Sequence, residues 1–167
     1  FVVAGVTTPS SIWEIGGGYG GTSAKLAALF PDARFVLTDL PPALLLQAYY
    51  LNELFPGEVT VIPLDSGMGS STSHSRFVLS SSRDTGLAPG SIDGVLNTRS
   101  FQEMERPTVR RYFRELQEAL RESGIFMNVN RLVKIGFRFT EYPYDLRWRS
   151  LESEPAFEQA GIWSLVT

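Results

Sequence analysis

Apolar residues along the chain form two alternating patterns, namely short continuous runs and longer segments with helical spacing. The runs predict strands at residues 11–15, 34–38, 91–96, 125–129 and 161–167. Apolar residues three or four positions apart predict helices at residues 22–30, 41–54 and 107–122. Strands that alternate with helices are typical of an α/β domain whose mostly parallel sheet is covered by helices on both faces.

One strand of this series has two candidates. Residues 59–62 follow the second predicted helix directly, whereas residues 76–80 come after a serine- and glycine-rich stretch, 66–75. The pattern leaves open which of the two lies next to the second strand.

Composition limits the function. The chain has 167 residues and a net charge of −3, which suggests one domain, 1–167, and gives no basic field for nucleic acid. No apolar run reaches the roughly 18–20 residues of a membrane span. The absence of cysteine excludes disulfides and cysteine metal sites, and we expect a cytoplasmic protein. Because the chain begins close to its first strand, we also expect that an N-terminal extension is missing.

A glycine-rich turn separates the first strand from the first helix. Its five glycines are Gly16, Gly17, Gly18, Gly20 and Gly21. Glycine permits positive φ and close approach of a ligand, and the helix N-terminus behind it offers unpaired N–H groups. This strand, turn and helix predict a site for a nucleotide-like molecule at the edge of the sheet.

The turn fits two templates. Gly16-x-Gly18-x-x-Gly21 is the dinucleotide fingerprint, and Asp39 follows 18 residues later, near the expected position of a ribose-binding acid. With Glu14 in front, the turn also fits the pattern of S-adenosylmethionine-dependent methyltransferases. A carboxylate at position 14 would repel a pyrophosphate, but it suits the cationic amino-acid part of S-adenosylmethionine. Glu14 therefore favours S-adenosylmethionine.

Several segments together resemble the sugar O-methyltransferases of bacterial polysaccharide gene clusters. They are residues 13–21, 36–41, 49–56, 97–104 and 130–131. The resemblance implies a Rossmann-like class I methyltransferase fold, a three-layer α/β sandwich with a seven-stranded sheet whose last strand is antiparallel. It also implies methyl transfer from S-adenosylmethionine to a sugar hydroxyl, with the block 97–104 as the most specific part.

On this hypothesis eight residues bind the cofactor: Glu14, Gly16, Gly17, Gly18, Gly20, Asp39, Leu40 and Asn97. Asp39 would bind the ribose hydroxyls, although an aspartate here could instead cap the next helix. Leu40 would cover the adenine, and Asn97 would bind the methionine part. The adenine amino group would meet Asp65 if residues 59–62 form the third strand, or residues near Ser81 if residues 76–80 do.

The residues after the fourth strand are the candidates for catalysis and acceptor binding. We expect Glu103 to be the general base, with an idle helix N-terminal carboxylate as the alternative. Arg99 and Arg131 are expected to bind the sugar. No histidine cluster or acidic motif indicates a metal site.

Two other functions stay open on the sequence. The first is an NAD(P)-dependent oxidoreductase on the same glycine turn, and the second is a non-catalytic scaffold that keeps the cofactor site. We expect a small-molecule cofactor and a sugar or glycan acceptor as partners, with no nucleic acid and no membrane. The sequence does not indicate the oligomeric state.

Overall fold

The computed structural model describes residues 8–63, 75–81, 85–131, 133–134, 137–138, 141–144, 148, 150–157 and 161–166. The elements of the first half are β1 (Ser11–Ile15), α1 (Gly21–Leu29), β2 (Arg34–Asp39), α2 (Pro41–Leu54), β3 (Val59–Val61), β4 (Phe77–Ser81) and β5 (Ile92–Thr98). They are followed by the short 3-10 helix η2 (Phe101–Glu103), α3 (Arg106–Ala119), β6 (Leu120–Arg131), β7 (Val133–Lys134), β8 (Phe137–Arg138), β9 (Ser150–Phe157) and β10 (Gly161–Val166).

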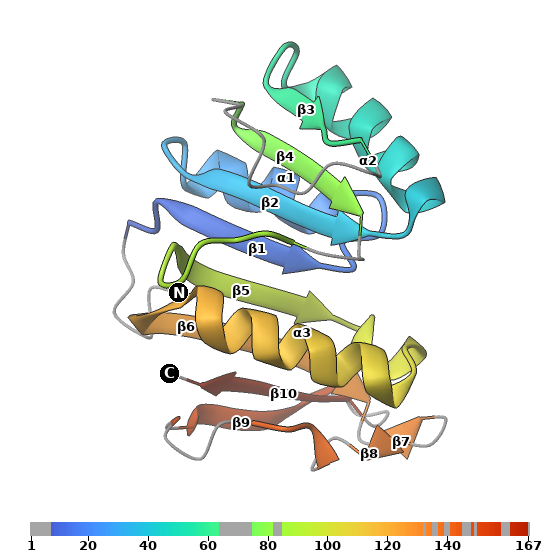
Figure 1. Cartoon of the computed structure of the whole chain (residues 1–167), viewed down its shortest axis with the longest axis vertical. Coiled ribbons are helices and arrows are strands. Elements are labelled where there is room, and N and C mark those ends of the chain that lie inside the picture. Colours follow the sequence, from blue (N-terminus) through green and yellow to red (C-terminus); the bar gives the residue numbers. More distant parts are fainter. Residues whose placement is uncertain are drawn as a thin grey trace.

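The main sheet has eight strands in the order β3-β4-β2-β1-β5-β6-β10-β9 (Figure 1). The six strands from β3 to β6 are mutually parallel, and β10 pairs antiparallel with both β6 and β9. The parallel α/β sheet and its antiparallel last strand are therefore confirmed. The expected number of seven strands is wrong, since both β3 and β9 extend the sheet.

Both candidates for the third strand are strands. β4 pairs with β2, and β3 lies outside β4 at the edge of the sheet. In this register Ser81 lies directly opposite Asp39. Ser81, rather than a residue after β3, is thus the neighbour of Asp39 at the carboxyl end of the sheet. Asp65 lies outside the described residues.

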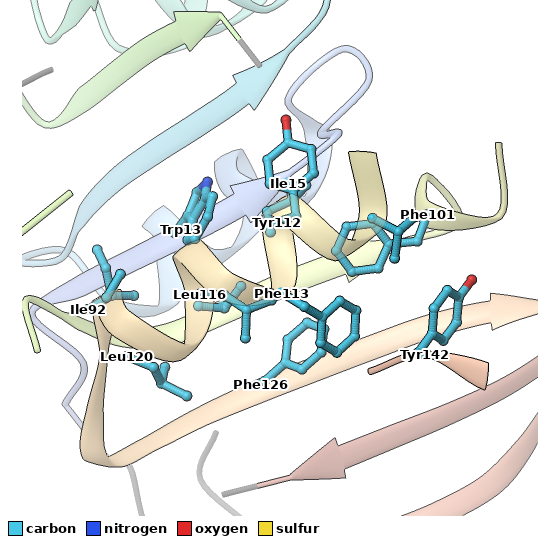
Figure 2. Packing of buried hydrophobic residues seen from close by; sticks show 13 residues of the cluster. Trp13, Ile15, Ile92, Phe101, Tyr112, Phe113, Leu116, Leu120, Phe126 and Tyr142 are labelled. Atoms are coloured by element: carbon cyan, nitrogen blue, oxygen red, sulfur yellow. The ribbon is translucent and has the colours of Figure 1, made fainter. Parts of the chain in front are cut away.

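Helices cover the two faces of the sheet. In Figure 1, α3 lies in front of β5 and β6, while α1 lies behind β1 and β2. One buried cluster contains Ala24 and Ala27 of α1 together with Leu44 and Leu51 of α2, so these two helices share a face. The other cluster joins α3 to the opposite face through Tyr112, Phe113, Leu116, Trp13 and Phe126, among others (Figure 2). The three-layer arrangement is confirmed.

The third helix ends earlier than the sequence predicts. It stops at Ala119, and β6 begins at Leu120, so Ser123 and Gly124 lie within the strand and do not cap the helix. Leu120, whose backbone is already extended, belongs to the buried cluster that also holds Phe113 and Leu116 of α3. A register shift in the pairing with β5, between Ile92 and Gly94, accommodates the extra polar residues.

The carboxyl ends of β1, β2, β4 and β5 meet at one edge of the sheet because these strands are parallel and adjacent. In open α/β sheets, ligands bind at this edge. The glycine turn, Asp39 and the segment after β5 are all found there.

Candidate functional site

The turn after β1 adopts backbone conformations that favour glycine. Gly16, Gly18 and Gly20 have φ values of 70°, 61° and 90°, a region that residues with a Cβ rarely occupy. A Cβ on Gly16 would lie 2.2 Å from Ser100 Oγ. The Gly16 N–H donates to the carbonyl oxygen of Thr38 at 2.8 Å. The missing side chain thus lets the turn contact both β2 and the segment after β5.

Glu14 is buried under the turn, with 2% of its surface exposed. Its Oε2 accepts hydrogen bonds from the N–H and the hydroxyl of Ser23 in the first turn of α1. A Cβ on Gly17 would lie 3.1 Å from the Glu14 carboxyl carbon. Burial raises the pKa of Glu14, and the hydrogen bonds from Ser23 oppose that shift. The carboxylate therefore supports the helix N-terminus in this structure.

Asp39 ends β2 beside the glycine turn. Its Oδ2 accepts a hydrogen bond from the Gly18 N–H at 3.0 Å, and its Oδ1 accepts one from the Leu40 N–H at 2.7 Å. Burial raises the pKa of Asp39 against these hydrogen bonds. The N-cap position of α2 is Leu40, and no side chain caps this helix. The helix-cap alternative for Asp39 is therefore wrong.

Gln47 is a site residue that the sequence reasoning missed. Its fully buried side chain donates from Nε2 to the Gly18 carbonyl oxygen and to Asp39 Oδ2, each at 3.0 Å. Its Oε1 has no hydrogen-bond partner among the described residues. Gln47 lies on the buried stripe of α2 between Leu44 and Leu51. A polar residue in that apolar stripe was the available signal.

A cavity of about 680 Å³ opens at this edge of the sheet. Its lining residues come from the glycine turn, the β2–α2 junction, the segment after β5, and α3. They are Gly16, Gly18, Thr38, Asp39, Leu40, Ala43, Thr98, Arg99, Ser100, Glu103, Met104, Glu105, Thr108 and Tyr112. The Leu40 residue is 64% exposed at its rim, although leucine is apolar. The cavity thus has one side from the β2 end and another from the β5 end of the sheet.

The β5 side of the cavity contains a strained residue. Arg99 has a φ of 62° and is the one residue other than glycine with positive φ in the described part of the chain. Its N–H donates to the carbonyl oxygen of Val129 on β6 at 2.6 Å. Such a backbone costs about 1–3 kcal/mol and persists where its surroundings hold it.

Glu103 lines the same side and is exposed. Its Oε1 accepts a hydrogen bond from Gln102 Nε2 at 3.2 Å. Glu103 lies in η2, and the N-cap residue of α3 is Glu105. Glu103 is thus the acidic residue in the first turn of η2 and not of α3, and its role as the base or as an idle helix N-terminal carboxylate stays a prediction.

The predicted site residues fall into two groups. Those that line the cavity are Gly16, Gly18, Asp39, Leu40, Arg99 and Glu103, whereas Glu14, Gly17, Gly20, Asn97 and Arg131 are not among the lining residues. Gly20 is the N-cap of α1. Asn97 is fully buried and donates to the Ile15 carbonyl oxygen at 3.0 Å. Arg131 is exposed and donates its backbone N–H to Gln102 Oε1 at 2.8 Å.

The described segments contain neither a cluster of metal ligands nor a helix that could cross a membrane. These residues contain no group of three or more histidines and carboxylates that could hold a metal ion. None of their helices combines the length and the apolar character that a membrane crossing requires.

Residues 13–128 match the family described as methyltransferase domain. No curated protein matches the sequence.

Similar solved structures include three methyltransferases. A TehB-like S-adenosylmethionine-dependent methyltransferase from Corynebacterium glutamicum is 14% identical, with a TM-score of 0.67 over 99% of this chain and 84% of its own. The mitomycin 7-O-methyltransferase is 15% identical, with a TM-score of 0.66 over 99% of this chain and 52% of its own. A Galdieria sulphuraria protein proposed to be a sarcosine dimethylglycine methyltransferase is 15% identical, with a TM-score of 0.59 over 77% of this chain and 43% of its own.

Because the identities are only 14–15%, these likenesses show the fold alone. The chain spans about half the length of the mitomycin enzyme and less than half of the Galdieria protein.

Proposed function

The chain belongs to the methyltransferase-domain family, and on this premise we propose that it transfers a methyl group from S-adenosylmethionine to a hydroxyl group of a sugar. S-adenosylmethionine is the cofactor of this domain. Because the chain belongs to this family, the alternative of an NAD(P)-dependent oxidoreductase is dropped. The acceptor, the residue roles and a cytoplasmic location are proposals.

The residues of the β2 side fit a nucleoside. A carboxylate has four acceptor directions, two on each oxygen. Asp39 accepts two hydrogen bonds on Oδ2, from Gly18 and Gln47, and one on Oδ1, from Leu40. One direction on Oδ1 can still accept a ribose hydroxyl. The exposed Leu40 beside it offers an apolar surface for the adenine.

The glycine turn fits the part of the cofactor between the ribose and the amino acid. Gly16 and Gly18 line the cavity without side chains, so a ligand can lie against the backbone. Glu14 reaches Ser23 and lies under the turn, so in our proposal it supports the turn and acts on the amino group of the cofactor only through its negative field.

The chemistry depends mainly on positioning. When bound, S-adenosylmethionine supplies an electrophilic methyl group, and the acceptor oxygen must lie in line with its carbon–sulfur bond. A sugar hydroxyl is a weak nucleophile, so a base that takes its proton increases the rate. The Glu103 carboxylate lines the cavity on the β5 side, and we assign it this role. Gln102 Nε2 holds one of its oxygens.

The acceptor assignment is carried by the polar character of the β5 side. Arg99, Glu103, Glu105 and Thr108 line this side together with Tyr112. Guanidinium, carboxylate and hydroxyl groups match the many hydroxyls of a sugar. Arg131 is not among the residues that line the cavity, so its role in sugar binding stays a prediction.

The proposal is tested in two steps. Calorimetry with S-adenosylhomocysteine measures cofactor binding, and NAD serves as the control ligand. Transfer of a labelled methyl group is then measured with methyl glycosides and nucleotide-linked sugars, and in parallel with sarcosine and a phenol. We expect methylation of a sugar and none of the other acceptors.

Each outcome has a defined meaning. Methylation of sarcosine or the phenol but of no sugar would refute the acceptor class while leaving methyl transfer intact. Binding of S-adenosylhomocysteine without methylation of any acceptor would favour the non-catalytic scaffold. Absence of binding would refute the proposed function of this chain as a whole.

A further inference from the structure

Three buried asparagines on neighbouring strands form a connected chain of amides next to the cavity. Asn97 of β5 and Asn128 and Asn130 of β6 are at most 1% exposed. Asn130 lies in the middle, because its Nδ2 donates to the side-chain oxygens of Asn97, at 2.8 Å, and Asn128, at 2.5 Å. At its outer end, Asn128 Nδ2 donates to the Tyr144 hydroxyl at 2.6 Å.

The amide chain holds the backbone that carries Glu103. Asn130 Oδ1 accepts the Gln102 N–H at 3.1 Å, and Asn97 Oδ1 accepts the Phe101 N–H at 3.2 Å. Gln102 in turn donates from Nε2 to Glu103. Side chains of two strands therefore fix the position of η2.

The same chain reaches the cofactor side. Asn97 Nδ2 and Ser100 Oγ both donate to the carbonyl oxygen of Ile15, at 3.0 and 2.9 Å. Ile15 is the last residue of β1 before Gly16. The carbonyl at the start of the glycine turn and the backbone at the start of η2 are thus bonded to one network.

A second observation agrees with a positioning role. The strained Arg99 donates its N–H to Val129, which lies between Asn128 and Asn130 on β6. Buried amides cost free energy unless their partners are satisfied, and a strained backbone needs surroundings that hold it. Apolar side chains at the three asparagine positions would avoid the cost of burying amides, but they could not hold the backbone of residues 99–102.

We propose that Asn130 is a positioning residue for methyl transfer. Its amide links β5, β6 and η2, and so sets the distance between Glu103 on the acceptor side and the glycine turn on the cofactor side. The assignment of Glu103 as the base rests on the proposed function, whereas the restraint of residues 99–102 does not.

Two variants test the proposal. Asn130→Leu has a similar volume and removes every hydrogen bond of the amide. Asn130→Asp keeps an acceptor for the Gln102 N–H but loses both donors when ionised. Leu116→Ala, in the core below α3, is the control for general loss of stability.

The first measurement needs no acceptor. Amide hydrogen exchange gives protection factors for residues 99–102, and calorimetry gives the affinity for S-adenosylhomocysteine. In Asn130→Leu we expect protection of Arg99, Phe101 and Gln102 to fall about tenfold or more, with cofactor affinity changed by less than about threefold. Leu116→Ala should lower protection throughout the sheet instead.

The aspartate variant adds a pH dependence. A buried carboxyl is protonated well above its usual pKa, and its O–H can then replace one donor of the amide. The titratable groups that the amide chain reaches are Glu103, through Gln102, and Tyr144, through Asn128. At about pH 8.5 we expect Asn130→Asp to lower the protection of Arg99 and Phe101 while Gln102 keeps its acceptor, and at about pH 6 we expect part of the lost protection to return.

The second measurement uses whichever acceptor the first assays identify. Asn130→Leu should lower kcat about tenfold or more with the KM for S-adenosylmethionine nearly unchanged. Unchanged protection of residues 99–102 in Asn130→Leu, or equal protection of Asn130→Asp at both pH values, would overturn the proposal. So would a normal kcat in Asn130→Leu. If no acceptor is methylated, the proposed function fails, while the exchange results still test the restraint.

Discussion

The side-chain amide of Gln47 donates one hydrogen bond to the Asp39 carboxylate and another to the Gly18 carbonyl oxygen, both at 3.0 Å. Asp39 in turn accepts the Gly18 N–H. The three residues come from α2, the end of β2 and the glycine turn, and they form a closed set of contacts at the rim of the cavity. Both the turn and the ribose-binding candidate therefore depend on α2.

Replacement of Gln47 should weaken cofactor binding. Gln47→Leu removes both donated bonds and also the buried Oε1 that has no partner in the described residues, so we expect a small change in Tm. The affinity for S-adenosylhomocysteine should fall about tenfold because the turn and Asp39 lose their support. Calorimetry and thermal unfolding measure both, with exposed Asn52→Leu on the same helix as the control. Wild-type affinity in Gln47→Leu would contradict the role.

Asp39→Ala should have the larger effect. It removes the carboxylate that we propose binds the ribose and that accepts three hydrogen bonds, and we expect the affinity for S-adenosylhomocysteine to fall about 100-fold. The control is Asp32→Ala, which removes an exposed carboxylate before β2. If both variants bind like the wild type in calorimetry, Asp39 is not a ligand contact.

The close approach of Gly16 and Ser100 predicts a stability difference between two glycine variants. Gly16→Ala and Gly57→Ala both place alanine at positive φ, 70° and 79°, but a Cβ on Gly57 meets nothing within 4 Å. Gly57→Ala should cost about 1 kcal/mol of unfolding free energy. Gly16→Ala should cost about 1–3 kcal/mol more because of the clash.

Denaturant titration measures this difference, and the double variant Gly16→Ala/Ser100→Gly separates its causes. Because Ser100→Gly by itself loses the bond to the Ile15 carbonyl oxygen, it is the reference for the double variant. In the Ser100→Gly background, Gly16→Ala should cost only about as much as Gly57→Ala does. Equal costs for the two single variants would show that the turn tolerates a side chain at Gly16.

Burial of Glu14 predicts a pH dependence of stability. Its pKa is raised above the ordinary value of 4.5, so the folded state binds more protons than the unfolded state between these two values. The stabilisation that protonated Glu14 gives to the folded state is fully present below about pH 4.5, and it is lost as the pH rises through the raised pKa. Glu14→Gln keeps an acceptor for Ser23 and cannot ionise, so its unfolding free energy should fall less over this range.

Denaturant titrations at several pH values compare the slopes, with exposed Glu53→Gln on α2 as the control. The raised pKa of Asp39 adds a slope of the same sign in all variants. Identical slopes for the wild type and Glu14→Gln would mean that Glu14 does not titrate in this range.

Two glutamate variants test the proposed role of Glu103 as the general base. Glu103 and Glu105 both line the cavity, and Glu103→Gln should lower kcat about 10²–10⁴-fold, as loss of a general base does. Glu105→Gln, at the N-cap of α3, should keep most of the activity. The affinity for S-adenosylhomocysteine should stay unchanged in both. The reverse ranking of kcat values would move the role to Glu105.

Much of this site followed from local sequence signals. Positive φ at Gly16, Gly18 and Gly20 was expected from the glycine spacing, and the place of Asp39 beside the turn followed from the order of parallel strands. The inclusion of Gln47 and of the asparagine chain did not follow, because each depends on which side chains meet across strands. The sequence shows a glutamine in an apolar stripe and asparagines at strand ends, but it does not show which residues these side chains contact.

The sequence by itself determined the alternation of strands and helices, and with it the parallel sheet and the ligand-binding edge. These features depend on hydrophobic periodicity and turn residues, which act over a few positions. Only the tertiary structure decided that β4 lies next to β2, that Glu14 turns under the glycines towards Ser23, and that the Asn130 amide joins η2 to β5. Glu14 and Ser23 are 9 positions apart in the sequence, and Asn97 and Asn130 are 33 positions apart. Packing of the whole sheet brings such residues together.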